Sequence, residues 1–186
     1  MTTTSTASAY QNYILYRTVA KTVQPASYTG PDGKTVTPEP VTAQKAGYVA
    51  GAQLLTGLTG ITIPEGFAYA LDADKAYPVG SVYTPTTAYT LTGASTATAG
   101  TAIELSLTPN NDGPTAASMV TLSDGGAGGT FSAGTVTFGA TTATAQTVTY
   151  TPKAAGTVSI SATNNGGLTD PAALSITVSA AAAATS

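Results

Sequence analysis

The 186-residue sequence contains no histidine, no cysteine and no tryptophan. The absence of histidine removes the commonest general base and metal ligand of proteins, and the absence of cysteine removes disulfides, thiolate nucleophiles and the usual structural zinc sites. A serine nucleophile would need a lysine or an unusual carboxylate as its base, and no spacing in the sequence supports such a pair. We therefore expect a protein that is not an enzyme and that uses no cofactor and no metal ion.

Charged residues are also scarce, at 8% of the chain against about 25% in ordinary soluble domains. The surface must instead be built from threonine, serine, alanine, glycine and asparagine, whose contacts depend little on salt. The formal net charge of −3 argues against a protein that follows the phosphates of nucleic acid. The N-terminus shows neither the basic start nor the apolar core of a secretory signal, and no apolar run is long enough to span a membrane. Nucleic acid and membrane lipid are therefore not the expected partners.

The second half of the chain has a two-residue periodicity. Between Ser123 and Ala180, apolar and hydroxyl side chains alternate, and clusters of glycine, asparagine or proline interrupt the alternation at regular intervals. This pattern is typical of half-buried antiparallel strands joined by turns. Residues 102–109 and 119–122 add earlier strands of the same kind. Counted from residue 89, the pattern predicts about seven strands, the number of an immunoglobulin-like β-sandwich.

Several segments of this half also resemble a known family. They read SDGGAGGTF, VTF, QTVTYTP and AGTVSISATNNGGLTDPAAL. They resemble an immunoglobulin-like module that recurs in bacteriophage virion proteins and in some bacterial surface proteins. The resemblance covers residues 89–180 and does not extend to the first half of the chain. It implies only the sandwich architecture, because the disulfide and the core tryptophan of antibody domains are absent.

The predicted fold is therefore all-β, with two unlike domains. Residues 89–180 form the immunoglobulin-like sandwich, and residues 181–186 form a flexible tail. Residues 1–88 form a smaller, mainly β N-terminal domain for attachment or oligomerisation. Its first eight residues are rich in threonine and serine and are expected to form an extended N-terminal lead. Residues 84–88 are expected to be a linker.

Three tyrosines at a spacing of three stand near the start of this domain: Tyr10, Tyr13 and Tyr16. A helical turn would place the three rings on one face, whereas the neighbouring threonines and valines favour a strand, so both structures stay open. The rings either pack inside the protein or form an aromatic docking patch, because tyrosine combines a large apolar area with a polar tip. Downstream, residues 28–36 contain Gly-Pro-Asp-Gly, which predicts a β-hairpin or an exposed loop.

The most apolar part of the first half includes Leu54, Leu55 and Leu58. These leucines must be buried within the domain or against a neighbouring molecule, and we take them, with the three tyrosines, as candidate docking residues. Farther along, Asp72 and Asp74 form a D-x-D pair of the kind that can bind calcium. The glycine and the distal glutamate of a calcium loop are missing, so a solvated turn is the expectation.

The resemblance implies a bacteriophage virion structural protein, in particular a capsid decoration or head-fibre protein. Its N-terminal domain would attach to the major capsid protein or another virion protein, and the immunoglobulin-like module would project outward, with weak adhesion to a host-surface glycan. Such a protein would be a homo-oligomer located in the virion and assembled in the host cytoplasm. Two alternatives stay open: a tail, neck or fibre-associated virion protein, and a bacterial surface adhesin module, which would need an export route.

Overall fold

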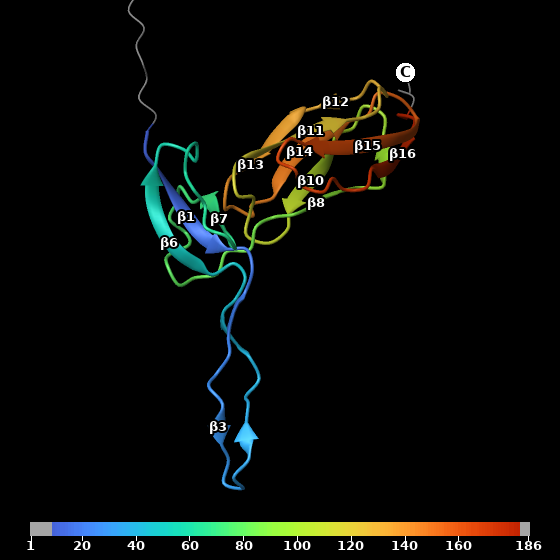
Figure 1. Ribbon diagram of the computed structural model, residues 1–186. Helices are drawn as coiled ribbons and strands as arrows, with labels where there is room; N and C mark the ends of the chain where they lie inside the picture. The colour runs from blue at the N-terminus through green and yellow to red at the C-terminus, as the bar shows by residue number, and fades with distance from the viewer. Residues whose placement is uncertain (1–8, 183–186) are drawn as a thin grey trace, which may run out of the picture. The chain divides into compact units, whose positions relative to one another are not determined.

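The computed structural model describes residues 9–182, in which sixteen strands and no helix occur. The expected N-terminal lead (residues 1–8) and the last four residues of the expected tail lie outside this range. The chain divides into two compact units between Thr84 and Pro85, and the described residues of each unit form strands joined by turns and loops (Figure 1). The all-β prediction is therefore confirmed. Across residues 9–182, no helix is long and apolar enough to cross a membrane.

The first unit is built on a three-stranded antiparallel sheet. Its strands, in spatial order, are β6 (Val49–Leu55), β1 (Gln11–Arg17) and β7 (Phe67–Leu71). Because side chains alternate across a strand, β1 turns Ile14 and Tyr16 toward one face. There they form a small core with three further side chains, namely Val49, Ala70 and Tyr83. The Tyr16 ring meets the Tyr83 ring edge-on at 5.1 Å, a favoured arrangement of aromatic pairs.

Between β1 and β6 the chain forms a long two-stranded hairpin over residues 21–44, which we call the long hairpin (Figure 1). Near its base, β2 (Lys21–Val23) pairs with β5 (Val41–Gln44), and near its tip, β3 (Tyr28–Thr29) pairs with β4 (Thr35–Val36). Prolines at positions 25, 38 and 40 separate the two ladders, because proline lacks the backbone donor that a ladder needs.

The second unit is a sandwich of two sheets. One sheet has the order β12 (Thr130–Phe131), β14 (Gln146–Thr151), β10 (Ile103–Pro109), β8 (Tyr89–Gly93). The other has the order β13 (Thr135–Phe138), β11 (Ser118–Ser123), β15 (Gly156–Asn164), β16 (Leu174–Ser179), β9 (Thr96–Thr98). All pairs are antiparallel except β9 with β16. In this topology β8, β10, β14 and β12 take the places of immunoglobulin strands A, B, E and D, and β11, β15 and β16 those of C, F and G.

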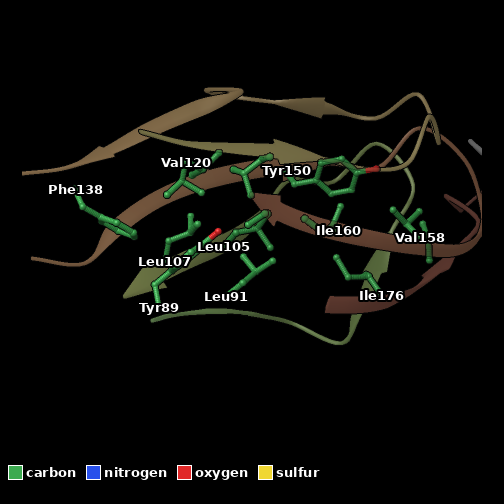
Figure 2. Close-up of a cluster of buried hydrophobic side chains, with 14 residues drawn as sticks. Tyr89, Leu91, Leu105, Leu107, Val120, Phe138, Tyr150, Val158, Ile160 and Ile176 are labelled. Carbon is green, nitrogen blue, oxygen red and sulfur yellow. The ribbon is translucent and has the colours of Figure 1, made fainter. Parts of the chain in front are cut away.

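The core of the sandwich lies between the two sheets and is formed by the apolar half of each alternating strand. Figure 2 shows Leu105, Leu107 and Tyr150 from one sheet facing Val120 and Ile160 from the other. Phe138 is fully buried, and its ring meets that of Tyr89 at 5.5 Å. Aliphatic and aromatic side chains thus fill the space that a disulfide and a tryptophan occupy in antibody domains.

Residues 85–88, expected as a linker, belong to the second unit in the structure. The backbone NH of Thr86 donates to the carbonyl of Gly113 (2.9 Å), and the NH of Thr87 donates to Asn110 Oδ1 (2.9 Å). Ala88 then forms a parallel bridge with Thr169. These bonds attach residues 86–88 to the sandwich. The two units therefore divide between Thr84 and Pro85 and not at residue 88.

Candidate functional site

Exposed apolar side chains concentrate in the first unit. Among residues 9–182, Met119 is the only large exposed hydrophobic side chain of the second unit. All the others belong to the first unit: Tyr10, Val19, Val23, Tyr28, Val36, Val41, Leu54, Leu58, Ile61, Ile63, Val79 and Val82. Exposed apolar side chains that gather into a patch often mark interaction sites. The first unit is therefore the place to look for an interaction site.

The tip of the long hairpin is a tight turn that its own sequence specifies. Gly33 adopts a φ of 74°, which favours glycine, and its NH donates to the carbonyl of Gly30 (3.0 Å). The NH of Gly30 donates to the carbonyl of Lys34 (2.8 Å), and the carboxylate of Asp32 accepts the NH of Lys34 (3.2 Å). The expected β-hairpin at Gly-Pro-Asp-Gly is thus confirmed, with a tip held by backbone bonds.

The stem of the long hairpin has no core of its own. Val23 pairs with Val41, and both side chains are about half exposed, at 47% and 57%. Tyr28 pairs with Val36, and these side chains are 58% and 38% exposed. A two-stranded hairpin alone is marginally stable in water. The stem therefore presents apolar pairs whose burial requires a partner surface.

Arg17 holds the base of the hairpin against the sheet. Its Nε donates to Gln44 Oε1 (2.7 Å), and its guanidinium lies 4.6 Å from the centre of the Phe67 ring. Its backbone NH donates to Tyr48 O (2.9 Å), and its carbonyl accepts the NH of Gly47 (2.7 Å). These bonds tie the outgoing and returning strands together where the hairpin leaves the sheet.

The structure does not bring the three candidate tyrosines onto one surface. The segment is a strand and not a helical turn, so Tyr13 and Tyr16 lie on opposite faces of β1. Tyr16 is a core residue with 5% exposure, Tyr13 is half-buried, and Tyr10 precedes the strand with 72% of its surface exposed. An aromatic patch of all three rings is therefore excluded, and Tyr10 alone remains as an exposed candidate for docking.

The candidate leucines lie at and beyond the end of β6. Leu54 is 62% exposed, Leu55 is half-buried on the opposite face of the strand, and Leu58 is 37% exposed in the turn that follows. Ile61 and Ile63 extend this exposed apolar segment. Of the two possibilities stated for the leucines, the unit itself leaves Leu54 and Leu58 uncovered, so their burial requires another molecule.

The long hairpin was not among the docking candidates chosen from the sequence, although a signal for it exists. Two short β-prone runs flank the Gly-Pro-Asp-Gly turn, and prolines bound both runs. Such a segment can form a hairpin but cannot join a central sheet. Apolar residues in a hairpin that cannot join a sheet stay exposed. This reasoning would have indicated a docking element at the hairpin.

Asp72 differs from the expected solvated turn because it is fully buried. Its carboxylate accepts the backbone NH groups of Ala76 (2.8 Å) and Tyr77 (3.1 Å), and its own NH donates to the carbonyl of Asn12 (2.9 Å). Asp74 is exposed. The D-x-D pair thus organises a turn around one buried carboxylate. No group of three or more acidic residues that could hold a metal ion occurs in residues 9–182.

The glycine loop between β11 and β12 is held by a carboxylate from within. Asp124 accepts the NH groups of Gly126 (3.1 Å) and Gly129 (2.8 Å) and the hydroxyl of Tyr150 (3.1 Å). Burial and the bond to Asp124 raise the pKa of Tyr150 to about 12. A Cβ at Gly129 would overlap the Tyr150 ring, so this glycine is required for close packing. The backbone NH groups of Gly126 and Gly129 therefore form their hydrogen bonds within the second unit.

A second buried tyrosine fixes the loop between β15 and β16. The hydroxyl of Tyr89 donates to Asp170 Oδ1 (2.8 Å), and Asn164 Nδ2 donates to the same oxygen (2.6 Å). These two bonds hold the pKa of Asp170 below its usual value, while burial and the bond to Asp170 raise the pKa of Tyr89. The loop is therefore tied to strand β8 through a charged hydrogen bond.

Replacing Tyr89 with phenylalanine should lower the free energy of unfolding by about 1 kcal/mol near neutral pH, because one hydrogen bond is lost. Since the folded-state pKa of Asp170 is lowered, the stabilisation is complete above the unfolded-state value of about 3.9 and is lost as the pH falls through the folded-state value. Urea unfolding between about pH 6 and pH 2 should show the difference between wild type and Tyr89→Phe shrinking with acid. The exposed Tyr10→Phe serves as the control, and a difference that does not change with pH would contradict the assignment.

No protein-family model and no curated protein matches the sequence. Among solved structures, the chain is similar to a CARDB domain of a Pyrococcus furiosus protein (16% identity, 50% of this chain and 86% of that chain, TM-score 0.35). It is also similar to the D00-D0 domain of intimin (20% identity, 49% and 46%, TM-score 0.35) and to the adhesin InvE of Yersinia pseudotuberculosis (14% identity, 90% and 49%, TM-score 0.40). This chain spans about half the length of the intimin and InvE chains. At these identities the likeness concerns the β-fold alone.

Proposed function

We propose that this chain is a bacteriophage virion structural protein, specifically a capsid decoration or head-fibre protein without enzymatic activity. The first unit attaches to the major capsid protein or to another virion protein, and the immunoglobulin-like sandwich is displayed outward. The observation that carries this proposal is the uneven distribution of exposed apolar side chains, which fall almost entirely in the first unit. The resemblance of residues 89–180 to virion modules gives the biological setting.

The long hairpin is the main attachment element in this proposal. Its apolar pairs Val23–Val41 and Tyr28–Val36 are exposed, and burial of apolar surface contributes about 25 cal/mol per Å². The hairpin carries two lysines and two carboxylates, whose formal charges cancel, so attachment through its apolar pairs should depend weakly on ionic strength. Apolar burial on an assembled shell would stabilise that shell over its free subunits. A homo-oligomer formed through the same surface is compatible with this attachment.

Attachment can be tested with particles assembled in the presence of either the wild-type chain or a hairpin variant. The variant carries four substitutions, namely Val23→Ser, Tyr28→Ser, Val36→Ser and Val41→Ser, all at exposed positions. Quantitative mass spectrometry of purified particles should find hundreds of wild-type copies per particle and at least about tenfold fewer copies of the variant, because the apolar contact is lost.

Met119→Ser provides the matched control, since it removes the exposed apolar side chain of the second unit and should leave the copy number unchanged. Circular dichroism of each purified variant checks that the fold is intact. Retention of the hairpin variant at wild-type level would refute attachment through the hairpin. A few to dozens of copies would place the protein in the tail or neck, and absence from particles would indicate a cellular surface protein.

A further inference from the structure

A pocket opens at one end of the sandwich, entirely within the second unit. It has a volume of about 530 Å³ and lies among three segments: residues 86–87 before β8, residues 114–117 between β10 and β11, and residues 165–169 between β15 and β16. Ligand-binding cavities in proteins commonly measure about 300–1,000 Å³. The size of the pocket is therefore that of a small-molecule site.

The strand topology identifies the end of the sandwich at which the pocket lies. The loops β10–β11 and β15–β16 correspond to the B–C and F–G loops of an immunoglobulin sandwich. In variable domains, loops at this end form the binding surface, because the paired strands hold them while their sequences can change without loss of the core. The pocket thus lies where the fold can carry a binding site independently of its core.

The lining of the pocket is polar but uncharged. It is formed by four threonines, Asn165, Gly166 and Gly167, with Leu168 and Pro114 supplying apolar contact. The Thr86 hydroxyl already donates to the carbonyl of Asn110. None of the described residues that line it is acidic or basic. Hydroxyls both donate and accept hydrogen bonds, whereas a charged ligand would find no counter-charge here. This chemistry suits a neutral ligand that is rich in hydroxyl groups.

The wall of the pocket contains one hydrogen-bond donor that the described residues do not use. Asn165 Oδ1 accepts the NH of Met119 (2.9 Å), while the amide nitrogen of Asn165 has no hydrogen-bond partner among residues 9–182 and is free to donate. The hydroxyl of Ser118 is buried and has no partner within the same range. It lies against Gly166, since a Cβ at that glycine would overlap it. The Ser118 hydroxyl lies behind Gly166 and does not open into the pocket, so the donor available to a ligand is the Asn165 amide.

The β15–β16 loop, which forms one side of the pocket, is held by hydrogen bonds. Asn164 Oδ1 accepts the NH groups of Gly166 (2.9 Å) and Leu168 (2.9 Å), and Asn164 Nδ2 donates to the carbonyl of Leu168 (2.7 Å). The NH of Thr169 donates to the carbonyl of Thr87 (2.8 Å), which joins two sides of the pocket. A ligand would therefore not have to order this loop, which lowers the entropic cost of binding.

We propose that this pocket binds one or two sugar units of a neutral glycan. The affinity of one site is weak, because the site contains no aromatic stacking platform, and display of many copies on one particle provides the avidity. The biological use of the site rests on the proposed function, in which many copies of the second unit are displayed on one particle. Sugar binding to the free chain does not depend on that function. A failure of particle attachment and a failure of sugar binding are therefore separate results.

The test is a titration of the full-length, isotope-labelled chain with the methyl glycosides of glucose, galactose and N-acetylglucosamine, followed by amide chemical shifts. We expect saturable shifts at millimolar sugar that are confined to residues 86–87, 114–117 and 165–169. Sialyllactose provides an anionic probe, and it should bind no better than lactose. Absence of shifts with every neutral sugar up to about 50 mM, shifts spread over the whole sandwich, or binding of sialyllactose alone would each overturn the proposal.

Two substitutions at alanine positions make the test specific. Ala116 is exposed and lines the pocket, so Ala116→Leu should fill the cavity and weaken sugar binding about tenfold or more. Ala155 is exposed in the β14–β15 loop, at the opposite end of the sandwich because β10 and β14 run antiparallel, and Ala155→Leu should leave binding unchanged. The amide spectrum of each variant reports directly whether it is folded. Equal binding by both variants would show that the sugar does not occupy this pocket.

Discussion

Replacing Phe138 with alanine is expected to lower the free energy of unfolding of the second unit by about 3–5 kcal/mol. The Phe138 side chain is fully buried and lies edge-on to the Tyr89 ring at 5.5 Å. Its removal takes away apolar burial and leaves a cavity that the paired strands cannot close, because both sheets are fixed by their ladders. Urea unfolding followed by circular dichroism would measure the loss.

Met119→Ala is the matched control for this experiment. Met119 lies on the neighbouring strand β11, directly opposite Thr137 of β13, and its side chain is 44% exposed. A truncation there should change the free energy of unfolding by no more than about 0.5 kcal/mol, as for most surface positions. Comparable losses from the two substitutions would mean that the core does not lie between the sheets where Figure 2 places it.

Replacing Asp72 with alanine is expected to destabilise the first unit by about 2–4 kcal/mol, because two hydrogen bonds to a buried charge are lost. The backbone NH groups of Ala76 and Tyr77 would lose their acceptor in a turn that packs against the small core. Hydrogen exchange should show faster opening of the β1 and β7 amides, while the amides of the second unit remain as protected as in the wild type.

Asp72→Asn and Asp74→Ala complete the series. Asparagine retains one acceptor oxygen but presents an NH₂ group where the second oxygen stood, so its effect should fall between those of wild type and alanine. Asp74 lies in the same turn and is exposed, and its replacement should change stability by no more than about 0.5 kcal/mol. A large effect of Asp74→Ala would indicate that both carboxylates act together, as they would around a bound cation.

The sandwich could be predicted closely from the sequence, and the first unit could not. In the second half, two-residue alternation and turn residues fix which side of each strand is buried, as at Leu105, Leu107, Val148 and Tyr150. In the first unit, three tyrosines spaced three residues apart fit a helical turn and a strand equally well. The neighbouring strands β6 and β7 decide the matter, because β1 pairs with both. That pairing joins residues far apart in the sequence.

The same limit applies to the candidate docking residues and to Asp72. Leu54 and Leu58 were predicted to be buried either within the domain or against a neighbouring molecule, and the first unit leaves both exposed. Tyr16 was grouped with Tyr10 by spacing, although burial separates the two completely. Asp72 was assigned to a solvated turn because no local signal reveals that a turn packs against a core. Each of these errors concerns exposure, a quantity that depends on contacts across the whole unit.

The sequence by itself determined the all-β class, the sandwich in the second half and the hairpin turn at residues 30–33, because backbone propensity and alternation act between near neighbours. Only the tertiary structure decided which apolar residues remain uncovered, where the two units divide, and that three separate loops enclose a pocket. The physical reason is that burial and enclosure are set by strands and loops that meet in space after long separations along the chain.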